Sequence, residues 1–235
     1  MIEKNIFQTW NTRQLNSVIA SKINSFRKMN PEYNYFLFID EEIDSFVNLY
    51  FKGPIAEAYN KLNIIVAKVD LWRLLILYAY GGVYLDMDSS IDRPLKELIQ
   101  DQDDAIITAE GNPGVYVQWA LIYKKGHPIL KRAIEIVVNN IHKNAFPNNI
   151  LKMTGPVAYS QAINEVHISH YKNIIKHKEI TNNTDVLYRN KTGYNYRIYG
   201  IDYNDFFSFK YPECYLLYIN KKSWSEELSQ EQLIK

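Results

Sequence analysis

The sequence lacks most of the features that assign a protein to a membrane or to an oxidising compartment. It contains one cysteine, Cys214, in 235 residues, so no disulfide can form within the chain, and a reducing compartment fits. No apolar signal region follows the N-terminus, and we therefore expect a cytoplasmic protein. The longest apolar stretch, residues 62–80, contains Lys68, Asp70 and Arg73. These charges argue against a transmembrane segment.

The sequence also lacks an excess of charge of either sign. Lys and Arg together number 27 and Asp and Glu number 26, which leaves a net charge of +1. Such a balance gives no general attraction to nucleic acid or to an anionic membrane. Hydrophobic residues make up 47% of the chain, which is typical of a globular protein. A partner must therefore be recognised by a local site.

Strands and helices alternate in the first half of the chain. Strands are expected at residues 5–10, 35–39, 83–87, 105–110, 115–123 and 215–219, and helices at 15–26, 43–50, 62–80, 128–142 and 156–166. This order predicts an α/β fold with a mostly parallel central sheet flanked by helices and a β-rich C-terminal part. Without repeats or linkers, residues 1–235 are expected to form one domain. Ligands of such sheets bind beyond the carboxyl ends of the strands.

A charged pair interrupts the apolar helix at residues 62–80. Asp70 and Arg73 are three residues apart, so they share a helix face and can form an ion pair. Burying either charge alone would cost several kcal/mol. Two interpretations are open: a structural salt bridge between helix and sheet, or a pair that faces the crevice and binds sugar hydroxyls.

Two aspartates lie at the end of the next expected strand. Alternation along this strand places Tyr84, Asp86 and Asp88 on one face. Two carboxylates at this spacing suit a hard divalent cation whose coordination a diphosphate completes. The alternative is a polar turn in which Asp88 or Ser89 caps the next segment of the chain.

Together these residues resemble the sugar-binding region with a DXD motif of glycosyltransferase family 32. More distantly, they are similar to the catalytic domain of the large clostridial glucosylating toxins. The matching residues are Asp70, Arg73, Gly81, Gly82, Tyr84, Asp86, Asp88 and Arg93–Leu95, with Thr154–Pro156 as a later landmark. Ile6–Trp10 resembles the opening segment of the family, with Phe7 where a histidine is usual.

The resemblance implies a GT-A type fold and a metal-dependent, retaining transferase. The donor would be a nucleotide-diphosphate hexose and the cofactor Mn²⁺ or Mg²⁺. The acceptor would be a glycan, a lipid-linked molecule or a protein, as in polysaccharide biosynthesis. Carried over by position, the nucleotide and donor sites comprise Phe7, Gln8, Trp10, Asp70, Arg73, Tyr84 and Asp86. The resemblance makes Asp86, Asp88 and Arg73 the catalytic residues, with Asp88 and Asp86 at the metal.

The C-terminal part departs from this family at one position. Ser223 and Trp224 match the family, but the histidine that often precedes them is absent. Asn220 is the substitute expected as a further metal ligand. We expect Ser223 and Trp224 to bind the donor as part of a lid.

Two other functional classes remain open from the sequence. A haloacid dehalogenase-like phosphatase also has Asp-x-Asp after an apolar strand, with Asp86 as nucleophile and Asp88 as general acid. An inactive carbohydrate-binding homologue would share the fold without catalysis. Elsewhere, surface positions are expected for Asp101, Asp103, Asp104, His167, His170 and His177.

Overall fold

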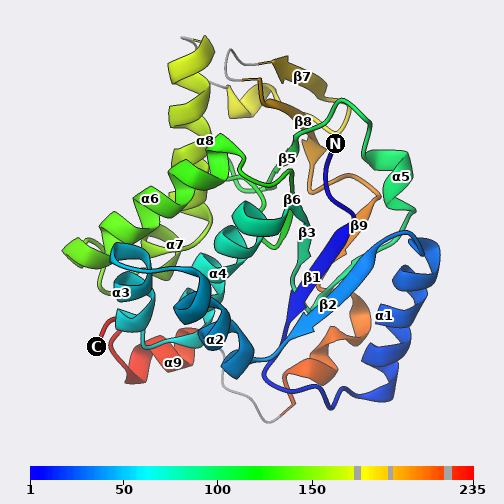
Figure 1. The fold of residues 1–235 in the computed structure, drawn as a ribbon. Helices are drawn as coiled ribbons and strands as arrows, with labels where there is room; N and C mark the ends of the chain where they lie inside the picture. Colours follow the sequence, from blue (N-terminus) through cyan, green and yellow to red (C-terminus); the bar gives the residue numbers. More distant parts are fainter. Residues whose placement is uncertain (172–175, 190–192, 220–223) are drawn as a thin grey trace.

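The computed structural model describes residues 1–171, 176–189, 193–219 and 224–235, and within these residues a seven-stranded sheet forms the centre (Figure 1). The strands, in their order across the sheet, are β2 (Asn34–Phe38), β1 (Asn5–Thr9), β3 (Gly82–Leu85), β6 (Ala120–Tyr123), β5 (Ala105–Ala109), β8 (Asn195–Ile201) and β7 (Asp185–Arg189). All run in one direction except β6 and β7. The predicted mostly parallel α/β sheet is confirmed.

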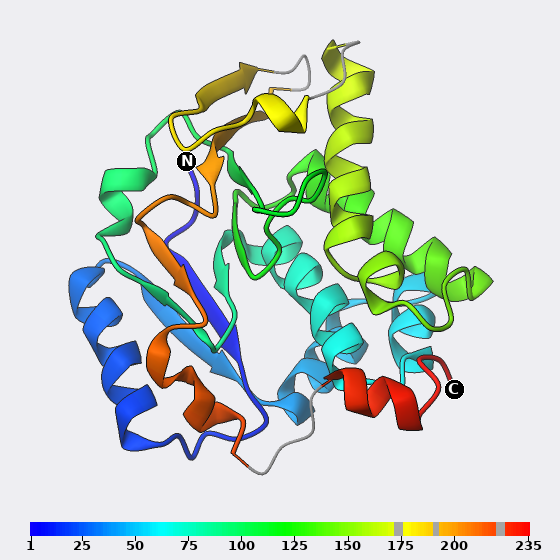
Figure 2. The ribbon, with the colours of Figure 1, turned by 180° about the vertical axis from the view of Figure 1, so that it is seen from behind.

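Helices cover both faces of the sheet (Figures 1 and 2). One face carries α2 (Asp40–Tyr50), α3 (Pro54–Lys61), α4 (Ile65–Tyr80), α6 (Pro128–Lys143), α7 (Ile150–Met153), α8 (Pro156–Tyr171) and α9 (Trp224–Gln230). The other face carries α1 (Ser17–Met29), α5 (Leu95–Leu98), the 3-10 helix η2 (Pro212–Leu217) and a ribbon of β4 (Ser89–Ile91) with β9 (Phe207–Phe209). A second 3-10 helix, η1 (His177–Glu179), precedes β7. No helix in the described part of the chain has the length and apolar character needed to cross a bilayer.

The buried helix α4 leads directly into β3 through two glycines. Gly81 has φ +65°, which ends the helix, and Gly82 approaches β1 so closely that an added Cβ would lie 2.5 Å from the Asn5 carbonyl oxygen. Because the connection is so short, α4 and β3 lie side by side in opposite directions. The start of α4 therefore lies at the same edge as the carboxyl end of β3.

Three predicted strands differ from the structure. The strand predicted at 83–87 ends at Leu85, because the chain turns at Asp86, whose carbonyl accepts a hydrogen bond from the Ser89 amide. Of residues 115–123 only β6 is a strand, and residues 215–219 form the end of η2 and a turn. The short elements α3 and β4 were not predicted, since eight and three residues carry little periodicity.

Two aspartates predicted on the surface are buried before β5. Asp103 is 0% exposed, and its carboxylate receives two hydrogen bonds from the Arg197 guanidinium of β8, at 3.0 and 2.7 Å. The Asp104 carboxylate accepts a hydrogen bond from the backbone amide of Asn195. His167 is also buried and bonds the Tyr196 hydroxyl. The sequence could not reveal these contacts, because the partners are distant along the chain.

Replacing Arg197 by Met should destabilise the fold. The Asp103 carboxylate would remain buried without its cation, which costs about 3–5 kcal/mol. Arg132→Met is the control, because Arg132 is 42% exposed and its ion pairs with Glu135 and Glu165 should contribute less than about 1 kcal/mol. Urea unfolding measures both. Equal losses in the two variants would contradict a stabilising role for the buried pair.

Candidate functional site

The Arg73 side chain is the centre of a charged group between α4 and the end of β3. Its guanidinium lies 3.1 Å from a carboxylate oxygen of Asp70 and 3.3 Å from one of Asp86. It also donates to the Gln118 carbonyl at 2.9 Å and lies 4.7 Å from the centre of the Tyr84 ring. Arg73 and Asp70 are each 5% exposed. The predicted pair thus exists, and Arg73 extends it to the first aspartate of the motif.

Burial and charge act in opposite directions on this group. Burial alone would lower the pKa of Arg73, but Asp86, Tyr84 and Asp70 together raise it. Burial raises the pKa of Asp86 to about 6, while Arg73 counteracts this shift and Asp88 adds to it. Burial likewise raises the pKa of Asp70, against the effects of Arg73 and Thr154. The guanidinium therefore keeps the buried Asp70 carboxylate and the partly exposed Asp86 carboxylate close to each other.

The two aspartates of the motif lie in a turn between β3 and β4. The Ser89 amide donates to the Asp86 carbonyl at 3.0 Å, so the strand face expected for Asp86 and Asp88 is wrong. The Tyr84 hydroxyl donates to the Asp86 carboxylate at 2.5 Å. The Tyr218 hydroxyl donates to the Asp88 carboxylate at 2.8 Å. The polar turn left open from the sequence is thus present, with both carboxylates held by tyrosines.

The end of β1 supports this turn from the other side. Gln8 is fully buried. Its side-chain oxygen accepts a hydrogen bond from the Tyr35 hydroxyl, and its side-chain nitrogen donates one to the Asp86 carbonyl at 3.1 Å. Trp10 meets the Tyr218 ring edge to face at 6.0 Å. Phe7, expected in the nucleotide pocket, lies instead in the hydrophobic core, stacked on Phe36. Its position inside β1 turns the ring toward α2 and α4, away from the polar face of Gln8.

Thr154 completes the group and was not assigned a role from the sequence. Its side chain is fully buried and its hydroxyl donates to the second carboxylate oxygen of Asp70 at 2.9 Å. The following Gly155 contacts α7 so closely that a Cβ would lie 2.9 Å from the Leu151 Cα. The Thr154–Pro156 segment was the sequence feature that pointed to this position, but only the fold shows that the segment lies against α4.

The oxygen ligands of the turn fit a hard divalent cation. The second carboxylate oxygen of Asp86 forms no hydrogen bond or ion pair among the described residues, so it can bind a ligand. In the same part of the chain, no three His, Cys, Asp or Glu side chains form a complete metal site. A metal at this turn would therefore need oxygen atoms from a bound ligand. Asn220 and Ser223 lie outside the described residues, and of Trp224 only the backbone position at the start of α9 is described.

Comparisons with known proteins identify sequences that resemble this chain. Residues 17–105 match the family described as glycosyltransferase sugar-binding region containing DXD motif. The chain is 25% identical to an initiation-specific alpha-1,6-mannosyltransferase of Candida albicans, over 77% of this chain and 56% of the relative. It is 29% identical to inositol phosphoceramide mannosyltransferase 3 of Schizosaccharomyces pombe, over 68% and 44%. The chain thus spans about half the length of these relatives.

Solved structures show the same fold. The PaToxG glycosyltransferase superposes with a TM-score of 0.57 at 21% identity, covering 70% of each chain. The ligand-free glycosyltransferase domain of the YGT toxin gives a TM-score of 0.50 at 11% identity, over 72% of this chain and 78% of that one. The phosphatase alternative gains no support from these matches. The resemblance seen in the sequence is confirmed: the chain has the GT-A type fold, and residues 17–105 match the glycosyltransferase sugar-binding region containing the DXD motif.

Proposed function

We propose that the protein is a metal-dependent, retaining glycosyltransferase that moves a hexose from a nucleotide-diphosphate sugar to an acceptor hydroxyl. One observation carries this proposal. Arg73 brings Asp70 and Asp86 together at the carboxyl edge of the sheet, beside Asp88, in a chain with the DXD region. Ligands of open α/β sheets bind at this edge.

Each residue of the site has a role in this reaction. Asp88 and Asp86 would hold Mn²⁺ or Mg²⁺, which when bound offsets the charge on the leaving diphosphate. Asp70 and Arg73 would bind and orient the donor hydroxyls, with Thr154 fixing the Asp70 carboxylate. Trp10, half-buried beside Tyr218, provides an aromatic face on which the base can stack.

The relatives suggest a first choice of donor sugar. Both are named mannosyltransferases, one forming an alpha-1,6 linkage and one acting on inositol phosphoceramide. We therefore propose mannose as the first sugar to test and leave the acceptor as a glycan, a lipid-linked molecule or a protein.

A thermal-shift screen of nucleotide sugars with Mn²⁺ tests the proposal most directly. A donor at 100 times its Kd should stabilise the protein by about 2.7 kcal/mol. Release of the nucleotide diphosphate then reports turnover. If a nucleotide sugar binds but is not turned over with any acceptor tested, the result would favour the inactive homologue. If no nucleotide sugar binds, the result would refute a donor site.

Transfer should depend on a divalent cation and on Asp88. Excess EDTA should abolish transfer and Mn²⁺ should restore it. Asp88→Asn should lower kcat at least about a hundredfold, because a bound metal stabilises the leaving group by several kcal/mol. Steady-state rates of nucleotide release measure both effects.

Asp92→Asn is the matched control for this variant. Asp92 lies just after β4, four residues beyond Asp88, but its carboxylate accepts hydrogen bonds from the Ser90 and Ser208 hydroxyls and not from the motif turn. This variant should keep the parent kcat. Undiminished transfer in excess EDTA, or equal losses in both aspartate variants, would contradict the metal role.

Thr154→Val should weaken use of the donor while Thr154→Ser should not. Valine keeps the shape but removes the hydrogen bond to the Asp70 carboxylate, and such bonds to charged groups contribute about 1.5–3 kcal/mol. If Asp70 binds the donor, kcat/KM for the donor should fall about ten- to a hundredfold. Serine retains the hydroxyl. A Val variant with a lower melting temperature but an unchanged kcat/KM would show that Thr154 serves only the fold.

A further inference from the structure

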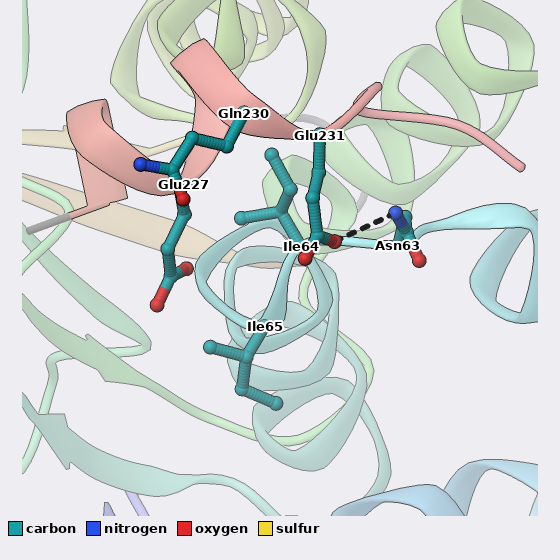
Figure 3. A pocket seen from close by; sticks show the side chains of 6 residues that line it. All are labelled: Asn63, Ile64, Ile65, Glu227, Gln230 and Glu231. Carbon is teal, nitrogen blue, oxygen red and sulfur yellow. Dashed lines mark hydrogen bonds between the residues drawn. The ribbon is translucent and has the colours of Figure 1, made fainter. Parts of the chain in front are cut away.

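A cavity of about 300 Å³ lies between the start of α4 and the C-terminal helix α9 (Figure 3). Its walls are formed by Asn63, Ile64, Ile65, Glu227, Gln230 and Glu231. Figure 3 shows the Glu227 and Glu231 side chains extending from α9 toward the start of α4. None of these residues belongs to the charged group around Arg73.

The C-terminal segment holds the walls of this cavity in place. The Asn63 amide donates to the Leu233 carbonyl at 3.0 Å, and the Lys235 amide donates to the Lys61 carbonyl at 2.9 Å. The Asn63 side chain donates to the Glu231 carboxylate at 2.9 Å, and Leu233 is 1% exposed. Backbone and side-chain hydrogen bonds thus join the segment before α4 to the C-terminal segment, and they hold the walls of the cavity in fixed positions.

The cavity lies at the edge of the sheet where the donor is proposed to bind. Because α4 and β3 run in opposite directions, the start of α4 and the Asp86 turn share this edge. Along α4, Ile65 lies about 8 Å beyond Asp70 and about 12 Å beyond Arg73, at 1.5 Å per residue. A molecule in the cavity would therefore be within a few sugar units of the donor hydroxyl contacts.

The chemistry of the cavity suits a neutral polyhydroxyl ligand. Carboxylates accept hydrogen bonds from hydroxyl groups. The Asn63 side-chain oxygen can accept them as well, while its two N–H groups donate to the Glu231 carboxylate and the Gln232 carbonyl. The Glu227 carboxylate makes no ion pair or hydrogen bond among the described residues. Two glutamates would repel a diphosphate, so the nucleotide is the wrong occupant. Ile64 and Ile65 supply the apolar surface that is usual in ligand pockets, and the volume is at the small end of their range.

We infer that this cavity binds one neutral sugar unit of the acceptor, with Glu227 accepting hydrogen bonds from its hydroxyls. The role of this sugar as an acceptor rests on the proposed transferase function. Binding of the sugar to the cavity can be measured without turnover. Glu227 thereby becomes a residue that determines acceptor affinity and has no part in donor binding.

Titration with methyl α-glycosides of mannose, glucose and galactose tests the inference, with backbone amide NMR as the readout. Saturable shifts should appear at residues 63–65 and 227–231 for at least one glycoside. Glu227→Ala should weaken that binding, and should raise the KM for the same glycoside as acceptor about tenfold through loss of one or more hydrogen bonds. The donor KM should stay at the parent value. Glu226→Ala is the control, because Glu226 is the adjacent carboxylate of α9 and does not line the cavity.

The outcomes separate this inference from the proposed function. Transfer to a glycoside with an unchanged acceptor KM in Glu227→Ala, and no shifts at these residues, would overturn the acceptor site and leave the transferase intact. Glycoside binding at the cavity with no turnover of any nucleotide sugar would support the sugar site and refute the transferase. Shifts that appear with Ca²⁺ alone and are absent with every glycoside would make the cavity a cation site and overturn the inference.

Discussion

The buried guanidinium of Arg73 is the constraint on which the site depends. Removing this cation from water costs several kcal/mol unless anionic and carbonyl oxygens replace the lost hydration. Asp70, Asp86 and the Gln118 carbonyl do so from α4, the motif turn and the segment before β6. Each of these segments is therefore held in place by the same side chain. Neither of the two interpretations of the Asp70–Arg73 pair excludes the other, because the ion pair that joins helix and sheet also places a carboxylate at the carboxyl edge of the sheet, where the donor is proposed to bind.

Most of the fold could be predicted because its signals are local. The period of apolar residues identifies α1, the long apolar run identifies α4, and the Gly81–Gly82 pair marks the change from helix to strand. The errors share one physical cause, which is that long-range contacts override local pattern. Residues 115–119 alternate like a strand but bond to β5 through isolated contacts, and Asp103 is polar but buried against Arg197. A sequence pattern carries no record of a partner that lies about ninety residues away.

The site was predictable in its residue types and less so in its geometry. Asp86 and Asp88 were identified by their place after a buried strand, yet the strand ends at Leu85, before both of them. Their carboxylates are held by Tyr84 and Tyr218 instead of by a shared strand face. Tyr218 was missed because residues 215–219 look like a strand and fold as the end of a 3-10 helix. Sequence spacing therefore located the chemistry, while the hydrogen bonds that orient it required the fold.

The charge of the site also limits what can bind there. Arg73 lies within 3.3 Å of two carboxylates, those of Asp70 and Asp86, and Asp88 adds a third carboxylate in the motif turn, so acidic groups outnumber the cation here. A diphosphate is negative as well, and its approach to this turn is unfavourable without a cation between them. Under the proposed function, a divalent metal would therefore serve donor binding as well as departure of the nucleotide. The same argument applies more strongly near Glu227 and Glu231, where no guanidinium is present among the cavity walls. The proposed donor would thus bind with a metal between its diphosphate and the turn, whereas a neutral sugar in the proposed cavity site would need no metal.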